Sequence, residues 1–378
     1  MSGQLVPLVP RAVAQGLAYL RRQWREGSTP AVLSFLVTAR CQLRCQHCFH
    51  HQAQTQDEGD ELSLDDYRRL ARSLDSLPVG LFCGGEPFLR ADLAEIIHLF
   101  REQSDLLIAL CSTNGQATGA VLDQSQAILA RHPSRPFVLS VSIDGFEEQH
   151  DQLRGRGTFR RALRTWQACQ QLARHHPNLV LMVTTVVSRL NQQVAPRFVR
   201  WAHAELQPDD VAVLLVRQQP RAGPELKQVA PERYWAAQTE ALRPLSHSRL
   251  WWLDHPELLH LGTTACGVHH TLTSGRRAFR CHAGRHGAVV DPAGRLHACE
   301  ALAEHPETGS MGKLPDLDMD FRTAWESSAA RRVRRWVGRH DICRSCTHET
   351  MGYLPSLPFA GNRLRWRPRK LTAGARPC

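Results

Sequence analysis

The stretch Thr38-Ala-Arg-Cys41-Gln-Leu-Arg-Cys45-Gln-His-Cys48-Phe49 decides how the rest of this chain is interpreted. Three residues separate its first two cysteines, and two residues separate the second and third. Three thiolates so close in the chain can bind three irons of a cubane iron–sulfur cluster. The fourth iron then has no protein ligand, and an open coordination position is typical of metal sites that bind a substrate or cofactor.

Zinc is the alternative metal for the same cysteines. Three thiolates and a fourth ligand elsewhere can form a tetrahedral zinc site, and His47, His50 or His51 could supply that ligand. The cysteine spacing alone favours the cluster but leaves the zinc site open.

The spacing CxxxCxxC, with His47 before the last cysteine, resembles the signature of the radical S-adenosylmethionine (radical SAM) superfamily. The resemblance implies that Cys41, Cys45 and Cys48 bind a 4Fe–4S cluster. It further implies that the open iron binds the amino and carboxylate groups of S-adenosylmethionine. Reductive cleavage of that cofactor then yields a 5′-deoxyadenosyl radical, so the resemblance predicts an enzyme.

Length and composition indicate a globular protein with a large and a smaller domain. The chain has 378 residues, of which 42% are hydrophobic and 22% charged. It contains no stretch of roughly 18 apolar residues, so no transmembrane helix is expected. Pro7, Pro10 and Arg11 make the N-terminus a poor secretory signal. We therefore expect a cytoplasmic protein without membrane contacts.

The net charge of +11 raises the question of a nucleic-acid partner. The densest basic run, Arg363–Lys370, alternates arginine with tryptophan, and such a tail could stack on bases. The arginines are otherwise spread through the chain, and no zinc-finger pair or RNA-binding aromatic motif is present. Nucleic acid is therefore not expected as a partner. A zinc-bearing nucleic-acid-binding or RNA-modifying protein is the alternative function.

Short apolar runs alternate with amphipathic ones between residues 31 and 217, and this alternation predicts a parallel sheet covered by helices. Six such units predict a partial (β/α)6 barrel of the TIM type rather than a closed barrel of eight units. The predicted strands are Leu33–Thr38, Val79–Cys83, Leu106–Cys111, Phe137–Ile143, Leu179–Val187 and Val211–Val216. The predicted helices are Ser63–Ser73, Leu93–Glu102, Val121–Arg131, Phe159–His175 and Pro196–Glu205.

The remaining segments complete a predicted domain organisation. An N-terminal helical extension (1–30) precedes the barrel (31–217), and a helical connector (218–261) follows it. Residues 262–350 contain short strands, turns and cysteines and are predicted to form a small α+β domain. Residues 351–378 are predicted to be a basic tail.

Polar and glycine residues follow the predicted strands, at the edge of the sheet where ligands bind in such folds. The family resemblance implies that Gly84-Gly85-Glu86-Pro87 binds the methionyl amino group and that Thr113 and Asn114 lie near the cofactor. It implies that Ser140, Ser142 and Asp144 reach the ribose hydroxyls and that Arg154 pairs with the methionyl carboxylate. No substrate-side acid, base or radical relay is assigned.

A second cysteine set occurs in the C-terminal part. Cys281, Cys299, Cys343 and Cys346 have a spacing that resembles the twitch and SPASM auxiliary-cluster domains. Four thiolates suffice for a 4Fe–4S cluster or for structural zinc. Only Cys378 follows Cys346, so one auxiliary cluster is expected, and Cys266 is not expected to be a ligand.

The same resemblance implies the partners of the reaction. A flavodoxin or ferredoxin-type protein supplies electrons, and the substrate is a peptide or a small molecule. The auxiliary cluster could accept the second electron of a net oxidation or cross-link. The sequence does not identify the substrate.

Overall fold

The computed structural model describes residues 29–51, 61–243, 256–278, 280–303, 305, 308 and 310–348. These residues form one nine-stranded sheet with the order β6-β5-β4-β3-β2-β1-β7-β8-β9. The strands from β6 to β7 are parallel, and β7, β8 and β9 are antiparallel. The outermost strands, β6 and β9, do not pair, so the predicted open barrel is confirmed.

The six strands of the barrel lie close to their predicted positions. The barrel strands are β1 (Val32–Thr38), β2 (Val79–Gly84), β3 (Ile108–Thr113), β4 (Phe137–Ser142), β5 (Leu179–Val187) and β6 (Asp210–Leu215). The C-terminal strands are β7 (Gly287–Val290), β8 (Arg295–His297) and β9 (Gly312–Lys313).

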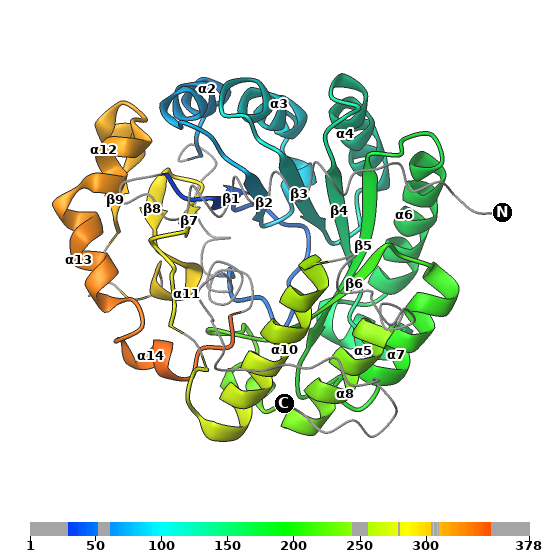
Figure 1. The fold of residues 1–378 in the computed structure, drawn as a ribbon. Helices are drawn as coiled ribbons and strands as arrows, with labels where there is room; N and C mark the ends of the chain where they lie inside the picture. The colour runs from blue at the N-terminus through cyan, green and yellow to red at the C-terminus, as the bar shows by residue number, and fades with distance from the viewer. Residues whose placement is uncertain are drawn as a thin grey trace.

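Helices cover the outer side of the curved sheet (Figure 1). Those of the barrel are α2 (Leu64–Ser73), α3 (Leu93–Gln103), α4 (Thr118–Arg131), α5 (Glu147–Arg154), α6 (Thr158–Ala173) and α7 (Ala195–Trp201), which continues as a π-helix (Ala202–Leu206). Two helices follow β6: α8 (Pro231–Leu242) and α10 (Pro256–Ser274). The C-terminal helices are α11 (Glu300–Ala303), α12 (Phe321–Glu326), α13 (Ser328–Trp336) and α14 (Asp341–Arg344). Short 3-10 turns lie at Pro87–Leu89, Pro224–Lys227 and Leu314–Leu317.

Apolar packing between sheet and helices fixes these positions. Every residue of β1 is buried, and the Phe35 ring lies 5.2 Å from that of Phe82 and 4.6 Å from that of Phe100. Ser63 caps α2 in a reciprocal capping box with Asp66, as the predicted N-cap requires. The end of the loop after β1 is thereby anchored to the core.

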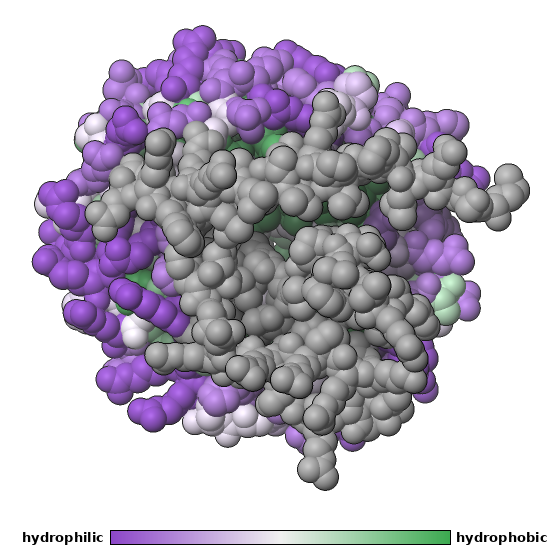
Figure 2. All heavy atoms as spheres, viewed as in Figure 1, coloured by the Kyte–Doolittle hydropathy of each residue, from purple (hydrophilic) through white to green (hydrophobic). Residues whose placement is uncertain are grey.

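Figure 2 shows the face that looks into the barrel opening, with hydrophilic residues around its rim and apolar residues towards its middle. In the part of the chain that the structure describes, no helix is both long enough and apolar enough to cross a bilayer.

The C-terminal part is more helical than the sequence predicted. The predicted short strands are present as β7, β8 and β9, but α10 extends to Ser274, and α12 and α13 follow β9. Helix α13 is strongly amphipathic, with Ala330 and Val333 buried, and the arginines around them hid this pattern from the sequence analysis. Strand β7 also pairs in parallel with β1, so the sheet continues without a break into the C-terminal part.

The predicted domain boundaries stay predictions. Helix α10 crosses the expected boundary between residues 261 and 262. Residues 1–28, which make up nearly all of the predicted N-terminal extension, and the basic tail (351–378) lie outside the described residues.

Candidate functional site

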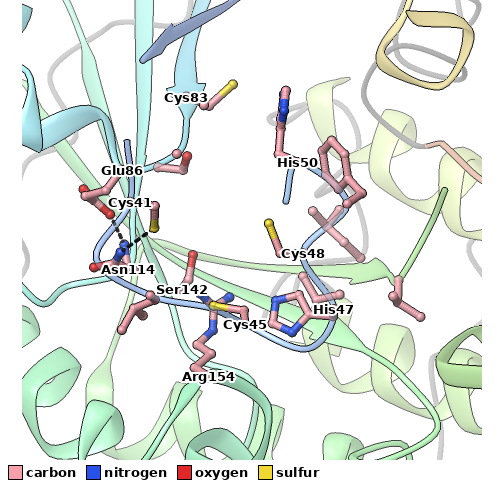
Figure 3. Close-up of a pocket in the computed structure, with 18 of the residues that line it drawn as sticks. Cys41, Cys45, His47, Cys48, His50, Cys83, Glu86, Asn114, Ser142 and Arg154 are labelled. Carbon is pink, nitrogen blue, oxygen red and sulfur yellow. Dashed lines mark hydrogen bonds between the residues drawn. The ribbon is translucent and has the colours of Figure 1, made fainter. Parts of the chain in front are cut away.

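The three cysteines of the first motif lie on the loop that follows β1 at the carboxyl end of the sheet. Cys41, Cys45 and Cys48 line one cavity, and their side chains point towards it (Figure 3). The loop bonds to itself, because the amide of Cys48 donates to the Cys45 carbonyl over 3.2 Å. The sequence alone predicted this grouping, since three neighbouring residues on one tight loop must remain close.

Two glycines bring the end of β2 against this loop. The amides of Gly85 and Glu86 donate to the carbonyls of Thr38 and Arg40 over 2.8 and 2.7 Å. A Cβ atom on Gly85 would lie 2.0 Å from the Arg40 carbonyl oxygen, and one on Gly84 would lie 2.4 Å from that of Thr38. The family resemblance placed these glycines in the segment that binds the methionyl amino group. In the structure they line the cavity, but their backbone packs against the cysteine loop.

Glu86 is a buried carboxylate at the cavity wall. It accepts hydrogen bonds from the Thr113 hydroxyl over 2.8 Å and from the Asn114 amide over 2.7 Å. Burial raises the pKa of Glu86 to about 7, although these hydrogen bonds lower it. The Asn114 side chain also lies 3.7 Å from the Cys41 sulfur. Strands β2 and β3 thus deliver three polar side chains beside the cysteine loop, as their positions after neighbouring strands predicted.

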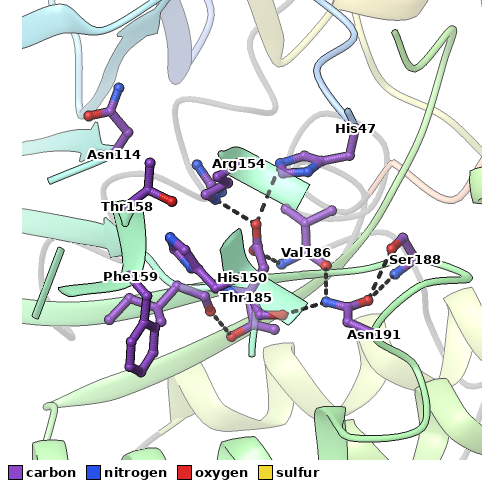
Figure 4. A network of polar contacts seen from close by, with 12 residues as sticks. His47, Asn114, His150, Arg154, Thr158, Phe159, Thr185, Val186, Ser188 and Asn191 are labelled. Carbon is purple, nitrogen blue, oxygen red and sulfur yellow. Dashed lines mark hydrogen bonds and ion pairs between the residues drawn. The ribbon is translucent and has the colours of Figure 1, made fainter. Parts of the chain in front are cut away.

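A buried ion pair lies under the same loop (Figure 4). The Arg154 Nε donates to Oδ2 of Asp144 over 2.6 Å, and Nε2 of His47 lies 3.6 Å from that oxygen. The other Asp144 oxygen accepts from the Val186 amide over 2.8 Å. Burial alone would raise the pKa of Asp144, but Arg154 and His47 lower it to about 2. Asn191 completes the network by donating to the Asp144 carbonyl over 2.7 Å.

The structure separates the predicted cofactor residues into two groups. Ten predicted residues, three of them cysteines, line the cavity: Cys41, Cys45, Cys48, Gly84, Gly85, Glu86, Thr113, Asn114, Ser142 and Arg154. Ser140 bonds instead to Thr184, and both oxygens of Asp144 are taken by protein donors. Neither residue lines the cavity, and the predicted ribose contact of Ser140 and Asp144 stays a prediction. Pro87 begins the 3-10 turn after Glu86 and is not part of the cavity lining.

The second cysteine set also converges. Cys281, Cys299, Cys343 and Cys346 line a separate, mostly apolar cavity, although 65 positions separate the first from the last. The hairpin of β7 and β8 leads into Cys299, and α14 carries Cys343. Cys266 is buried in α10 and does not line this cavity.

Polar side chains that were not predicted, Glu300, His348 and Arg217, lie between the two cysteine sets. Glu300 follows Cys299 and lines the first cavity together with Arg217 and Cys83. Nε2 of His348 lies 2.6 Å from Oε2 of Glu300, and Nδ1 of His348 lies 3.0 Å from the Arg217 guanidinium. A carboxylate directly after a cluster cysteine was the available signal for Glu300. Nothing in the sequence pointed to Arg217.

Both cavities have the donor set that an iron–sulfur cluster requires. Burial raises the pKa of Cys41 to about 11, and burial also raises the pKa of Cys45, Cys48 and Cys299. Without a metal these thiols remain protonated, and a metal that binds them releases the protons. Among the described residues, no three metal-binding side chains meet closely enough to share a single ion. In a cubane cluster each thiolate binds a different iron, so such close convergence is not required.

Two family models match this chain in the regions that contain the two cysteine sets. The radical SAM superfamily matches residues 35–201, and the SPASM iron–sulfur cluster-binding domain matches residues 281–347. Residues 35–201 are therefore a radical SAM domain, and residues 281–347 are a SPASM domain of the kind that binds auxiliary iron–sulfur clusters. The chain is an enzyme whose radical SAM domain uses a 4Fe–4S cluster and S-adenosylmethionine. This result replaces the zinc alternative.

Curated relatives match either less than half or most of this chain. The Fe-coproporphyrin III synthase of Methanosarcina barkeri is 36% identical over 39% of this chain and 36% of its own length. The mycofactocin maturase MftC of Mycobacterium tuberculosis is 26% identical over 87% of this chain and 79% of its own length. The match to the first curated relatives spans only 36 to 41% of their length.

Solved structures share the fold. The enzyme anSMEcpe with bound AdoMet superposes with a TM-score of 0.56 at 16% identity, covering 85% of this chain and 93% of that one. Streptococcus suis SuiB bound to its precursor peptide SuiA gives a TM-score of 0.57 at 12% identity, covering 87% of this chain and 73% of that one.

Binding of S-adenosylmethionine is expected to weaken as the pH falls from 8 to 6. Burial raises the pKa of Glu86 to about 7, so protonation in this range would remove the charge that is predicted to attract the methionyl ammonium. For one such group the dissociation constant should rise about tenfold across this range. Equilibrium binding of S-adenosylmethionine to the anaerobic holoenzyme at several pH values measures this change in the dissociation constant.

Ser142→Ala is the matched control, because Ser142 lines the same cavity and does not titrate. It should retain the pH dependence, whereas Glu86→Gln should bind weakly at every pH. An affinity that is constant between pH 6 and 8 in the parent protein would remove Glu86 from the ammonium site.

Proposed function

We propose that this enzyme reductively cleaves S-adenosylmethionine and abstracts hydrogen from a peptide or small-molecule substrate, in a net oxidation or cross-link assisted by one auxiliary 4Fe–4S cluster. The observation that carries the proposal is the convergence of Cys41, Cys45 and Cys48 with Glu86 on one cavity. When bound there, the cluster and S-adenosylmethionine supply the 5′-deoxyadenosyl radical.

The residues of the cavity would bind and orient the cofactor. Cys41, Cys45 and Cys48 would hold the cluster, and Glu86 would accept hydrogen bonds from the methionyl ammonium. Arg154 donates through Nε to Asp144, which leaves its two terminal nitrogens to face the methionyl carboxylate. Burial of both partners fixes the direction of the guanidinium.

The second cavity would hold the auxiliary cluster through Cys281, Cys299, Cys343 and Cys346. Glu300 and His348 lie between the two cysteine sets and are bonded to each other. Their position suits them to hydrogen-bond a substrate in the first cavity while remaining next to the second. The substrate could then lose its second electron to the auxiliary cluster.

A peptide substrate is supported by the relative that covers most of this chain, which is a maturase. The partial matches to haem synthases support a small molecule. A flavodoxin or ferredoxin-type protein would supply the first electron. We also propose a cytoplasmic location, because reducing conditions keep the thiols available for cluster binding.

Anaerobic iron and sulfide analysis, combined with a Cys343→Ala/Cys346→Ala variant, tests this function. The parent protein should contain about eight irons, the content of two cubanes, and the variant about four. The variant should still form 5′-deoxyadenosine under a chemical reductant, because the first cysteine set is unchanged. A parent protein without iron would contradict the whole proposal, and a variant that keeps eight irons would contradict the assignment of the second site.

A further inference from the structure

A shallow groove lies on the outer side of the cysteine loop. It is formed by the loop itself, by the end of α5 and by the start of α6. Its lining residues are Gln42, Leu43, Arg44, Gln46, Gln152, Leu153, Arg154, Gly155, Arg156, Thr158 and Arg161. We call this feature the basic groove, because Arg44, Arg156 and Arg161 are exposed along it.

The cysteine loop is the wall between the basic groove and the cluster cavity. Leu43 and Arg154 line both, and Figure 3 shows Arg154 beside Cys45 on the cavity side. The Gln46 amide donates to the Leu153 carbonyl over 2.8 Å, and its side-chain amide donates to the Gln152 carbonyl over 2.7 Å. These bonds hold the wall against α5. A molecule in the groove would therefore be separated from the predicted cluster ligands by one layer of chain.

No carboxylate is among the residues that line the groove. Arg44 and Arg156 form no ion pair with the residues that the structure describes, and Arg161 bonds to the neutral Gln116. The nearby Glu147 pairs with Arg160 over 2.7 Å. The Asp151 carboxylate accepts hydrogen bonds from the amides of Gly157 and Phe159. The groove therefore carries a local positive potential that attracts an acidic surface.

We propose that the basic groove is the docking surface for an acidic, low-potential electron carrier of the flavodoxin type. The inference deepens the proposed function, which requires one electron for each cleavage. The carrier loses one electron and the cluster gains it, and no bond forms between the two proteins. Docking here places the carrier against the cysteine loop from outside the cavity, so the cavity stays available for S-adenosylmethionine and substrate.

A single-stranded nucleic acid fits the groove less well. Proteins that bind single strands combine basic side chains with aromatic rings on which bases stack. The residues that line the groove include no aromatic side chain. Charge complementarity without a stacking surface favours an acidic protein partner.

The test compares two charge-reversed variants of the anaerobic holoenzyme. Arg156→Glu/Arg161→Glu changes the groove, and Arg332→Glu/Arg335→Glu makes the same charge change on the exposed side of α13. Calorimetric titration with a flavodoxin should show at least a tenfold weaker complex for the groove variant only. Higher salt should weaken the parent complex, as expected for exposed charges.

Formation of 5′-deoxyadenosine gives the second measurement. With limiting reduced flavodoxin, the groove variant should be slower than the parent by about the same factor as its loss of affinity. With dithionite, which needs no docking, all three proteins should react equally fast. A parent protein inactive with dithionite would contradict the proposed function, independently of the groove.

Three results would overturn the groove assignment. The first is an unchanged flavodoxin affinity of the groove variant, and the second is an equal loss in both variants. The third is weaker binding of an RNA oligonucleotide by the groove variant without any change in flavodoxin binding, which would assign the surface to nucleic acid.

Discussion

Replacing Cys41, Cys45 and Cys48 by alanine is expected to reduce 5′-deoxyadenosine formation to the background of a protein-free assay. The three thiols line one cavity and are the only cysteines of the first family match on that loop. Without them no cluster can be held beside Glu86, and the iron content should fall from about eight to about four atoms per chain. Chromatography of reactions reduced with dithionite measures 5′-deoxyadenosine, and an iron assay measures the iron content per chain.

Cys169→Ala is the control for this experiment. Cys169 is a buried thiol on α6 and lines neither cysteine cavity. The control should retain its iron and its ability to cleave S-adenosylmethionine. If the triple alanine variant kept this activity, the first cysteine set would have no role in it.

Asp144→Asn is expected to lower the free energy of unfolding by about 3–5 kcal/mol, the cost of breaking a buried ion pair on one side. Asp144 is fully buried and Arg154 is 8% exposed, so water cannot replace the lost carboxylate charge. Anaerobic urea denaturation at neutral pH measures the difference between the variant and the parent.

The pH dependence of this effect has a definite sign. The pKa of Asp144 is lowered in the folded protein from 3.8 to about 2, with Arg154 and His47 outweighing the effect of burial. The carboxylate therefore stabilises the fold above pH 3.8, and this contribution is lost as the pH falls towards 2. The free energies of unfolding of Asp144→Asn and of the parent should differ most near neutral pH and become similar in acid.

Glu147→Gln provides the matched control for an ion pair. Glu147 pairs with Arg160 at the surface, where the two side chains are 46% and 73% exposed. Exposed ion pairs contribute about 0–1 kcal/mol to the free energy of unfolding, so this variant should have almost the same free energy of unfolding as the parent. Equal destabilisation by both substitutions would show that burial does not strengthen the Asp144 pair.

The sequence predicted the barrel well because each of its elements has a local pattern. The predicted strand Leu179–Val187 coincides with the observed strand β5. The short helix Glu147–Arg154 was not predicted, because it is polar and few of its residues are buried. Its hydrophobic periodicity is therefore too weak to indicate a helix.

The site was predictable where chemistry is local and unpredictable where it depends on long-range contacts. The cysteine loop and Glu86 follow adjacent strands, so their proximity follows from strand order. The role of Asp144 could not be foreseen, because its partners His47, Arg154 and Val186 come from three separate segments. Arg217 and Glu300 meet only through the fold of the C-terminal part.

Strand β1 pairs with β2 on one side and with β7 on the other. The strand that leads into the first cysteine loop thus also pairs with the strand that carries the second cysteine set's hairpin. Relative sliding of the two halves would break the parallel ladder between Val32–Phe35 and Gly287–Val290. In this structure the ladder therefore sets the position of one sulfur-lined cavity relative to the other. Under the proposed function, an electron that passes from the first cavity to the second would cross the distance that this ladder sets.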